Sequence, residues 1–392
     1  MPVKDRIVTW YIQNILIPRT EIIDKPGFVV TTFTKPPDTT YLRELFLPEK
    51  LFELIETKIV KNYGDKGKQV LYSAGKKFGY VYASISNFPT ITTTNKKEFS
   101  DFAYYLMRYI EGVFSAKAQH EINLEEKLFI VIFNQYIVCR KNGLGYIMSD
   151  GGIAGIWSFA IEDKSIEGIQ VECQGRGDKR CYIVCEPEEK IKKRMTDYFS
   201  ETNLIEQQFD EMYKLLNEIR PTSYSNNSLK DLLNAGFFEY KHGSLTYKNI
   251  RFFPVEAHLL YFLENEISKL ENGEQILFDI CFEFGKYLRE TYGFKDYNKF
   301  IPDFFSALGF GDLIFIDVNK PTLGTIFYPW TSYSEKSKYI IFRGIMSGIV
   351  SDSLGKKIAF DEFKIDVGDC LTLTITQRQL LINNEETASK AS

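Results

Sequence analysis

The chain has 392 residues, a formal net charge of −4 and 44% hydrophobic residues, with its 48 basic and 52 acidic residues interspersed. This length exceeds what one hydrophobic core usually supports, and the composition excludes a mostly disordered chain. The interspersed charges argue against direct binding of nucleic acid, because a phosphate backbone is recognised by a continuous basic surface.

The sequence contains no segment typical of export or of membrane insertion. The first 24 residues carry charges inside their apolar stretch, and no run approaches the roughly 18 uncharged apolar residues of a membrane span. The six cysteines are unevenly spaced, unlike the disulfide framework of a secreted domain. We therefore expect a cytoplasmic protein without a membrane span.

Three amphipathic helices are predicted first along the chain. Apolar residues recur at helical spacing in 50–64, 69–79 and 96–118. The second of these carries Gly75 and Gly79 four residues apart, although glycine inside a helix costs about 1 kcal/mol relative to alanine. The pair therefore predicts a close helix contact on this face.

The hydrophobic period then changes to that of strands. Short β-branched and aromatic runs separated by turn residues predict strands at 127–139, 145–148, 155–161, 168–173 and 181–185. Helices followed by strands favour an α+β fold, in which a helical layer packs on an antiparallel sheet.

Residues 186–228 are charged and helical in pattern, and they predict a linker helix. Apolar residues from Ile205 to Ile219 alternate at spacings of four and three, so a short coiled-coil seam in a homodimer is the alternative. The polar segment 381–392 predicts a disordered tail.

The second part of the chain repeats the plan of the first. Gly344–Ile349 matches Gly151–Ile156, and Gly236–Tyr240 parallels Gly27–Thr31. Three further pairs follow in the same order: 252–256 with 46–49, 276–285 with 70–75, and 367–373 with 176–182. Ordered matches of this kind indicate a duplication. We expect two tandem domains, at 1–185 and 229–380.

The order of these motifs resembles the 4-vinyl reductase, or hydrocarbon-binding, domain family of archaeal type. The resemblance is carried by Gly151–Val184, with its Gly-x-x-x-Gly turn and final Glu-Cys…Gly-Asp-x-x-Cys hairpin. It covers 27–185 well and 236–375 more loosely. It implies a fold similar to that of TRAPP small subunits, and members of the family include the sensor domains of phenol-responsive transcription activators.

The resemblance also implies a metal site. In the phenol sensors, three cysteines and a glutamate hold zinc near the ligand pocket, and Cys173 and Cys181 match the two late cysteines. The chain departs from that pattern at Gln170, where glutamate is expected, and near Tyr146, where the upstream cysteine falls. In the second domain Lys364 replaces the first cysteine, so no metal is expected there.

The residues alone leave three states open for Cys173 and Cys181: a zinc site, a disulfide or two buried thiols. A closed zinc site needs four ligands. Glu172, Cys139 or Cys185 can complete it only if the fold brings them near. Cys185 is disfavoured because a strand places it four residues along from Cys181, at about 13 Å.

A pocket for a small apolar or aromatic ligand is expected between the helices and the sheet of the first domain. The candidate lining residues are Phe102, Leu106, Tyr109, Phe133 and Trp157. Core packing is the alternative role of each, because aromatic side chains fill cores as readily as pockets.

These features favour a small-molecule-binding protein, a sensor or carrier that acts through a protein partner. One alternative is an interaction scaffold resembling tethering-complex subunits. The other is a vinyl-group reductase, which is disfavoured because the sequence contains no flavin or nicotinamide fingerprint.

Overall fold

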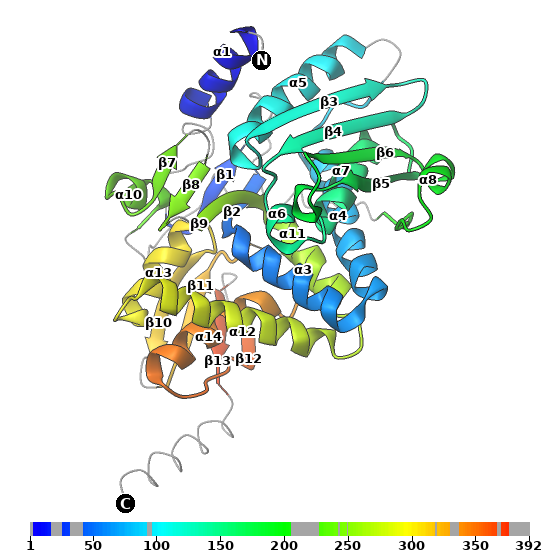
Figure 1. Ribbon diagram of the computed structural model, residues 1–392. Helices are drawn as coiled ribbons and strands as arrows, with labels where there is room; N and C mark the ends of the chain where they lie inside the picture. Colours follow the sequence, from blue (N-terminus) through cyan, green and yellow to red (C-terminus); the bar gives the residue numbers. More distant parts are fainter. Residues whose placement is uncertain are drawn as a thin grey trace, which may run out of the picture.

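The computed structural model describes residues 3–16, 26–31, 42–91, 96–204, 227–241, 244–248, 250–317, 320–329, 337–366 and 370–375. The fold is α+β, as predicted, and its strands in the described ranges form three antiparallel sheets. We call residues 3–204 the first half and residues 227–375 the second half (Figure 1). Among the described residues, no helix combines the length and the apolar character that a membrane crossing requires.

The first half begins with α1 (Val3–Tyr11), a π-helical turn (Ile12–Leu16) and strands β1 (Val29–Thr31) and β2 (Leu42–Pro48). Three long helices follow, namely α3 (Glu49–Tyr63), α4 (Asp65–Ile85) and α5 (Lys96–Val113). The remaining elements are β3 (Lys117–Asn123), β4 (Leu128–Asn134), α6 (Cys139–Asn142), α7 (Ile147–Ala160), β5 (Ile166–Glu172), β6 (Cys181–Pro187) and α8 (Glu188–Arg194).

The second half begins with α10 (Leu229–Asn234), β7 (Glu239–Lys241), β8 (Ser244–Tyr247) and β9 (Ile250–Glu256). It continues with three helices, α11 (His258–Ile267), α12 (Gly273–Tyr292) and α13 (Tyr297–Ala307). Strands β10 (Asp312–Asp317) and β11 (Thr322–Ile326), helix α14 (Ile340–Leu354), and strands β12 (Glu362–Asp366) and β13 (Cys370–Thr374) complete it.

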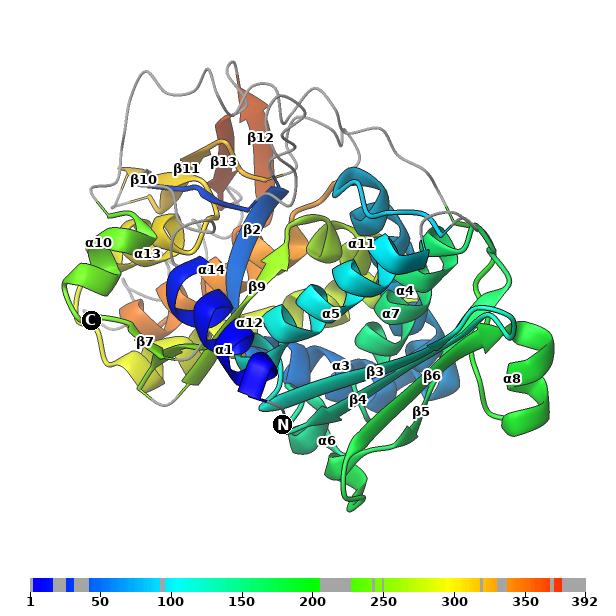
Figure 2. The ribbon, with the colours of Figure 1, turned by 90° about the horizontal axis from the view of Figure 1, so that it is seen from above.

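Each half has a four-stranded antiparallel sheet, and the two sheets share one strand order. The order is β3-β4-β6-β5 in the first half and β10-β11-β13-β12 in the second. The third sheet joins the halves. Its order is β1-β2-β9-β8-β7, with β2 and β9 paired antiparallel so that Leu45 lies opposite Val255. Figure 2 shows β2 and β9 side by side in the middle of the molecule.

The hydrophobic core is continuous across this junction. One cluster of buried side chains contains residues of both halves, and the rings of Phe52 on α3 and Phe253 on β9 lie 5.3 Å apart. Every residue of β2 is buried, which explains why this strand shows no alternation of apolar and polar residues.

Glycines bring α4 and α7 into close contact. A Cβ atom on Gly75 would lie 1.9 Å from the carbonyl oxygen of Met148, and one on Gly155 would lie 2.1 Å from that of Lys76. The corresponding helices of the second half meet in the same way, because a Cβ on Gly348 of α14 would lie 2.1 Å from the carbonyl oxygen of Phe282 on α12. The predicted close contact at Gly75 and Gly79 is confirmed.

The predicted helices at 50–64 and 69–79 are confirmed as α3 and part of α4, and the strands expected at 168–173 and 181–185 are β5 and β6. The strand expected at 127–139 is too long, because β4 ends at Asn134 and Cys139 begins the helix α6. The strands predicted at 145–148 and 155–161 are wrong, because this segment is the helix α7. Its faces are apolar nearly all round, since it is buried between α4 and the sheet, so no helical stripe marks it.

The helix predicted for 96–118 is too long. Helical geometry fails at Glu111 and Gly112, and Lys117–Asn123 forms the edge strand β3 instead. In the predicted linker, Glu188–Arg194 is helical, whereas the seam from Ile205 to Ile219 and the tail at 381–392 lie outside the described residues.

Candidate ligand cavity and cysteine cluster

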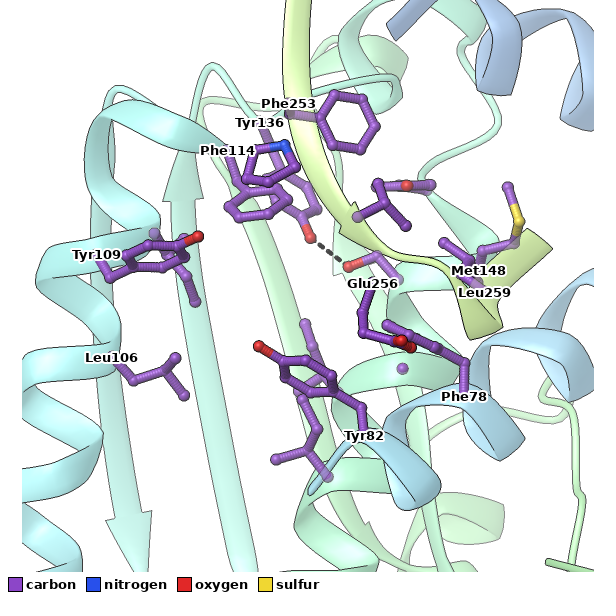
Figure 3. Close-up of a pocket in the computed structure, with 18 of the residues that line it drawn as sticks. Phe78, Tyr82, Leu106, Tyr109, Phe114, Tyr136, Met148, Phe253, Glu256 and Leu259 are labelled. Atoms are coloured by element: carbon purple, nitrogen blue, oxygen red, sulfur yellow. Dashed lines mark hydrogen bonds between the residues drawn. The ribbon is translucent and has the colours of Figure 1, made fainter. Parts of the chain in front are cut away.

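A cavity with a volume of about 170 Å³ lies at the junction of the two halves. Its walls come from α4, α5, β4 and α7 of the first half and from β9 and α11 of the second, which Figure 3 shows around the labelled side chains. Most of the residues that line it are aromatic or aliphatic. An apolar cavity on the order of 150 Å³ is large enough to bind benzene.

Helical spacing places the first wall. Phe78 and Tyr82 lie one turn apart on α4, with ring centroids 5.5 Å apart and stacked. Leu106 and Tyr109 face them from α5 (Figure 3). These four side chains are half-buried, unlike the core residues around them.

The second half closes the cavity. Phe253 of β9 lies 5.7 Å from Phe114, measured between ring centroids, and Leu259 of α11 also lines the cavity. Arg251, two residues before Phe253 on β9, donates from Nη2 to the carbonyl oxygens of Gly112 (2.6 Å) and Val113 (2.5 Å). The irregular end of α5 is therefore tied to the strand that forms the opposite wall.

A few polar groups also line the cavity. Glu44 of β2 and Glu256 of β9 are both buried, and the hydroxyl of Tyr136 is hydrogen-bonded to that of Ser149. Burial raises the pKa of Tyr136, so its hydroxyl stays protonated. A pocket of this kind suits a mainly apolar molecule that carries one polar group.

Three of the five predicted lining residues lie in the cavity wall, namely Leu106, Tyr109 and Phe133. The other two are not among the described residues that line it. Phe102 packs behind the wall on Phe88, with ring centroids 4.6 Å apart. Trp157 is fully buried, stacks on Phe129 and donates from Nε1 to the carbonyl oxygen of Lys127 at 2.9 Å.

Sequence reasoning missed the wall contributed by the second half, because it placed the pocket inside the first domain alone. The pairing of β2 with β9 joins segments about 200 residues apart, and no local periodicity reports such a pairing. Each strand has an apolar run beside its charged residues, Leu45–Leu47 in β2 and Phe252–Val255 in β9, but such runs do not specify which strands pair.

Three buried cysteines meet beside the cavity. The Sγ atom of Cys139 lies 3.3 Å from that of Cys173 and 3.0 Å from that of Cys181. All three are free thiols, and their Sγ atoms lie within 4.8 Å of one another. Hydrogen bonding to the Cys139 thiol, reinforced by Cys181, lowers the pKa of Cys173, which favours a thiolate there.

Two glutamates of α3 position the segment that carries Cys139. The backbone N–H of Val138 donates to Glu49 Oε1 at 2.8 Å, which holds Val138 at a φ of 62°, a region that β-branched residues rarely adopt. Glu56 accepts from the Asn142 side chain (2.9 Å) and from the N–H of Met148 at the start of α7 (3.1 Å). Burial raises the pKa of Glu56 to about 8, although these hydrogen bonds oppose the shift.

The predicted pair Cys173 and Cys181 is thus joined by Cys139, one of the three residues considered for completing the site. Glu172 instead pairs with Arg180, whose Nε lies 2.9 Å away, and Cys185 is buried outside the cluster. Gln170 lies against the cluster, with Nε2 3.6 Å from Cys139 Sγ. Three soft thiol donors in one buried group are chemically suited to a metal ion such as zinc.

No family model matches the chain, and no curated protein sequence matches it. Among solved structures, the phenol-responsive sensory domain of the transcription activator PoxR, crystallised with phenol, aligns over 48% of this chain and 93% of that chain, at 16% identity and a TM-score of 0.33. A trafficking protein particle complex subunit 3 from Naegleria fowleri, covalently bound to palmitic acid, aligns over 39% and 95%, at 16% identity and a TM-score of 0.26.

Proposed function

We propose that the chain binds a small, mainly apolar aromatic molecule in the cavity between its halves, and that it serves as a sensor or carrier that acts through a protein partner. The cavity supports this proposal most directly, because its volume of about 170 Å³ and its aromatic walls suit a single-ring compound. The same observation favours ligand binding over a purely structural scaffold, which needs no such cavity.

The position of the cavity supports a sensing role in particular. A ligand there contacts α5 and β9 at once, and Arg251 already joins these two elements through the carbonyl oxygens of Gly112 and Val113. Occupancy therefore changes the stability of the junction between the halves. A ligand that stabilises one arrangement of two connected elements shifts the population towards it.

Filling the cavity is expected to abolish ligand binding. Wild-type protein should be stabilised against heat by phenol or toluene, by about 2.7 kcal/mol at a hundredfold excess over the dissociation constant. Leu106→Trp places an indole in the cavity and should remove this stabilisation. The matched control is Tyr105→Trp, because Tyr105 neighbours Leu106 on α5 but is 54% exposed. Equal stabilisation of both variants, or none of the wild type, would contradict the proposal.

We also propose that Cys139, Cys173 and Cys181 hold a structural zinc ion. Cys139 begins α6 after β4, whereas Cys173 and Cys181 flank the turn between β5 and β6, so a shared ion would cross-link two connections of the first half. Gln170 and solvent are the available sources of a fourth ligand.

Loss of one cysteine of the cluster should therefore remove the metal. Cys181→Ser is expected to lower the zinc content to near zero and to destabilise the first half, because metal affinity contributes to folding at such sites. Cys185→Ser is the control: this thiol is equally buried on the same strand, but it lies outside the cluster. Elemental analysis that finds no zinc in purified wild-type protein, or equal zinc in both variants, would disprove a zinc site.

We further propose that the halves are diverged tandem copies of a domain of the 4-vinyl reductase type. Support comes from the shared strand order and from one repeated contact. Glu264 of α11 accepts from the N–H of Ile341 at the start of α14 (2.9 Å), as Glu56 of α3 does at the start of α7. An experimental structure in which the two four-stranded sheets and their helices do not superpose would contradict a duplication.

A further inference from the structure

Helix α1 presents a stripe of apolar side chains to solvent. Val3, Ile7, Trp10 and Tyr11 are each between 52% and 73% exposed. At about 100° of rotation per residue, these four positions share one face of the helix. No other helix or strand in the described ranges exposes more than two large apolar side chains. An exposed apolar surface of this kind marks a site of contact with a partner or a membrane.

Polar contacts hold the opposite side of α1 on α5, beside which it lies in Figure 2. Asp5 Oδ1 accepts from the hydroxyl of Tyr104 at 2.9 Å, and Thr9 is buried. In the π-helical turn that follows, Gln13 donates from Nε2 to the carbonyl oxygen of Glu111 at 2.6 Å. A surface helix usually turns its apolar stripe towards the core. The stripe of α1 points away from the core, so core packing does not account for it.

Two basic residues flank this stripe. Helical spacing places Lys4 on one side of it and Arg6 on the other, and both side chains are exposed. The acidic residue of the helix, Asp5, is turned towards α5 instead. The exposed face of α1 therefore carries positive charge and no negative charge. Apolar and aromatic side chains flanked by lysine and arginine are typical of helices that lie in the interface of a membrane with anionic lipids.

Charge and size both disfavour a protein on this face. Two copies of the chain docked through α1 would bring Lys4 and Arg6 of one copy close to the same residues of the other, and like charges repel. A helix of nine residues is about 14 Å long, which is short for the roughly 800 Å² that each partner buries in a stable protein complex. A membrane surface needs no such area, because each side chain gains separately from insertion.

We infer that α1 binds the surface of a membrane that contains anionic lipids. Val3, Ile7 and the ring of Trp10 enter the boundary between headgroups and acyl chains, where tryptophan is favoured. Lys4 and Arg6 extend along the two sides of the stripe to the lipid phosphates, because their long aliphatic stems lie against apolar surroundings while their charges stay in water. The inference concerns a surface separate from the cavity, so it does not depend on the proposed function.

The test measures sedimentation of the whole chain with two kinds of vesicle. One kind is phosphatidylcholine alone, and the other is an equal mixture of phosphatidylcholine and phosphatidylglycerol. Wild-type protein should bind the mixed vesicles and leave them at high salt, since salt screens the attraction. Trp10→Ser should weaken this binding about tenfold or more, as expected for the loss of one large buried apolar side chain. Arg6→Gln should weaken it about fivefold, as expected for one basic residue at an anionic surface.

Ile316→Ser is the matched control. Ile316 is 59% exposed, like the residues of the stripe, but it lies on β10, far from α1 in Figure 1. This variant should bind the mixed vesicles as tightly as the wild type. Circular dichroism of each variant checks that it is folded, and the comparison of the two kinds of vesicle in wild-type protein decides the question without any variant.

Three results would overturn the inference. The first is wild-type protein that ignores the mixed vesicles or binds both kinds equally. The second is Trp10→Ser that binds as tightly as Ile316→Ser. The third is a dimer, seen by sedimentation equilibrium, that Ile7→Ser dissociates, because this result would assign the stripe to a second copy of the chain. None of these results bears on the binding of phenol or toluene in the cavity.

Discussion

Replacement of Gly75 by alanine is expected to cause one of the largest losses of stability available to a single methyl group in this chain. The new Cβ would lie 1.9 Å from the carbonyl oxygen of Met148, so α4 and α7 would have to move apart along their whole contact. Overpacking of a well-packed site typically costs 1–3 kcal/mol, and a clash between two backbones belongs at the upper end. We expect a loss of about 3 kcal/mol or more in the free energy of unfolding, measured by urea denaturation.

Gly152→Ala provides the matched control for this prediction. Gly152 lies in the same helix pair, but its Cβ would lie 3.7 Å from the carbonyl oxygen of Gly75, an ordinary contact distance. Alanine is the better helix former by about 1 kcal/mol, so this variant should be neutral or slightly stabilised. If Gly75→Ala proved as stable as Gly152→Ala, the close approach of the two helices would not be a requirement of the fold.

The second large effect is expected at the buried pair of Lys76 and Glu167. Both side chains are fully buried, and Lys76 Nζ lies 2.7 Å from Glu167 Oε1. The hydroxyl of Tyr72 and the backbone N–H of Glu201 also donate to this carboxylate, at 2.7 and 3.0 Å. Lys76→Met leaves the carboxylate buried without its cation, and the loss of one partner of a buried pair typically costs about 3–5 kcal/mol.

The pH dependence of this variant gives a sharper test. Burial raises the pKa of Glu167, and Lys76 opposes that shift in the wild type, so Lys76→Met should raise the pKa further. When the pKa of a carboxyl group is higher in the folded state than in the unfolded state, the protein loses stability as the pH rises above the unfolded-state pKa, which is about 4.3 for glutamate. The deficit should therefore be smaller near pH 5 than at pH 8. At pH 8 the double variant Lys76→Met/Glu167→Gln should have a higher free energy of unfolding than Lys76→Met. A double variant that is no more stable than Lys76→Met would contradict this assignment.

Local patterns were enough to predict α3, α4 and the close contact at Gly75, because helical periodicity and glycine spacing are properties of one segment. They failed for α7, whose residues are apolar nearly all round because the helix is buried on most sides. An amphipathic stripe exists only where part of a helix faces water. Local patterns therefore predict two short strands in this segment.

The candidate site was predictable only to the extent that its members lie close in sequence. Cys173 and Cys181 flank one turn and were identified together, whereas Cys139 is 34 and 42 residues away and joins them through the pairing of β4 with β6. The cavity shows the same limit. Leu106 and Tyr109 follow from the face of one helix, but Phe253 and Glu256 reach the cavity only through the pairing of β2 with β9.

The β2–β9 pairing has a consequence for how this protein can evolve. In a dimer of identical chains, any substitution in a strand at the two-fold axis appears on both sides of the interface. Here the two strands belong to one polypeptide, so a change at Glu44 leaves the residue opposite it, Glu256, unaltered. The covalent connection also keeps the partners at a high effective concentration, even when one contact weakens. Each of the two paired strands can therefore accept mutations separately, and selection can change one wall of the cavity without changing the other.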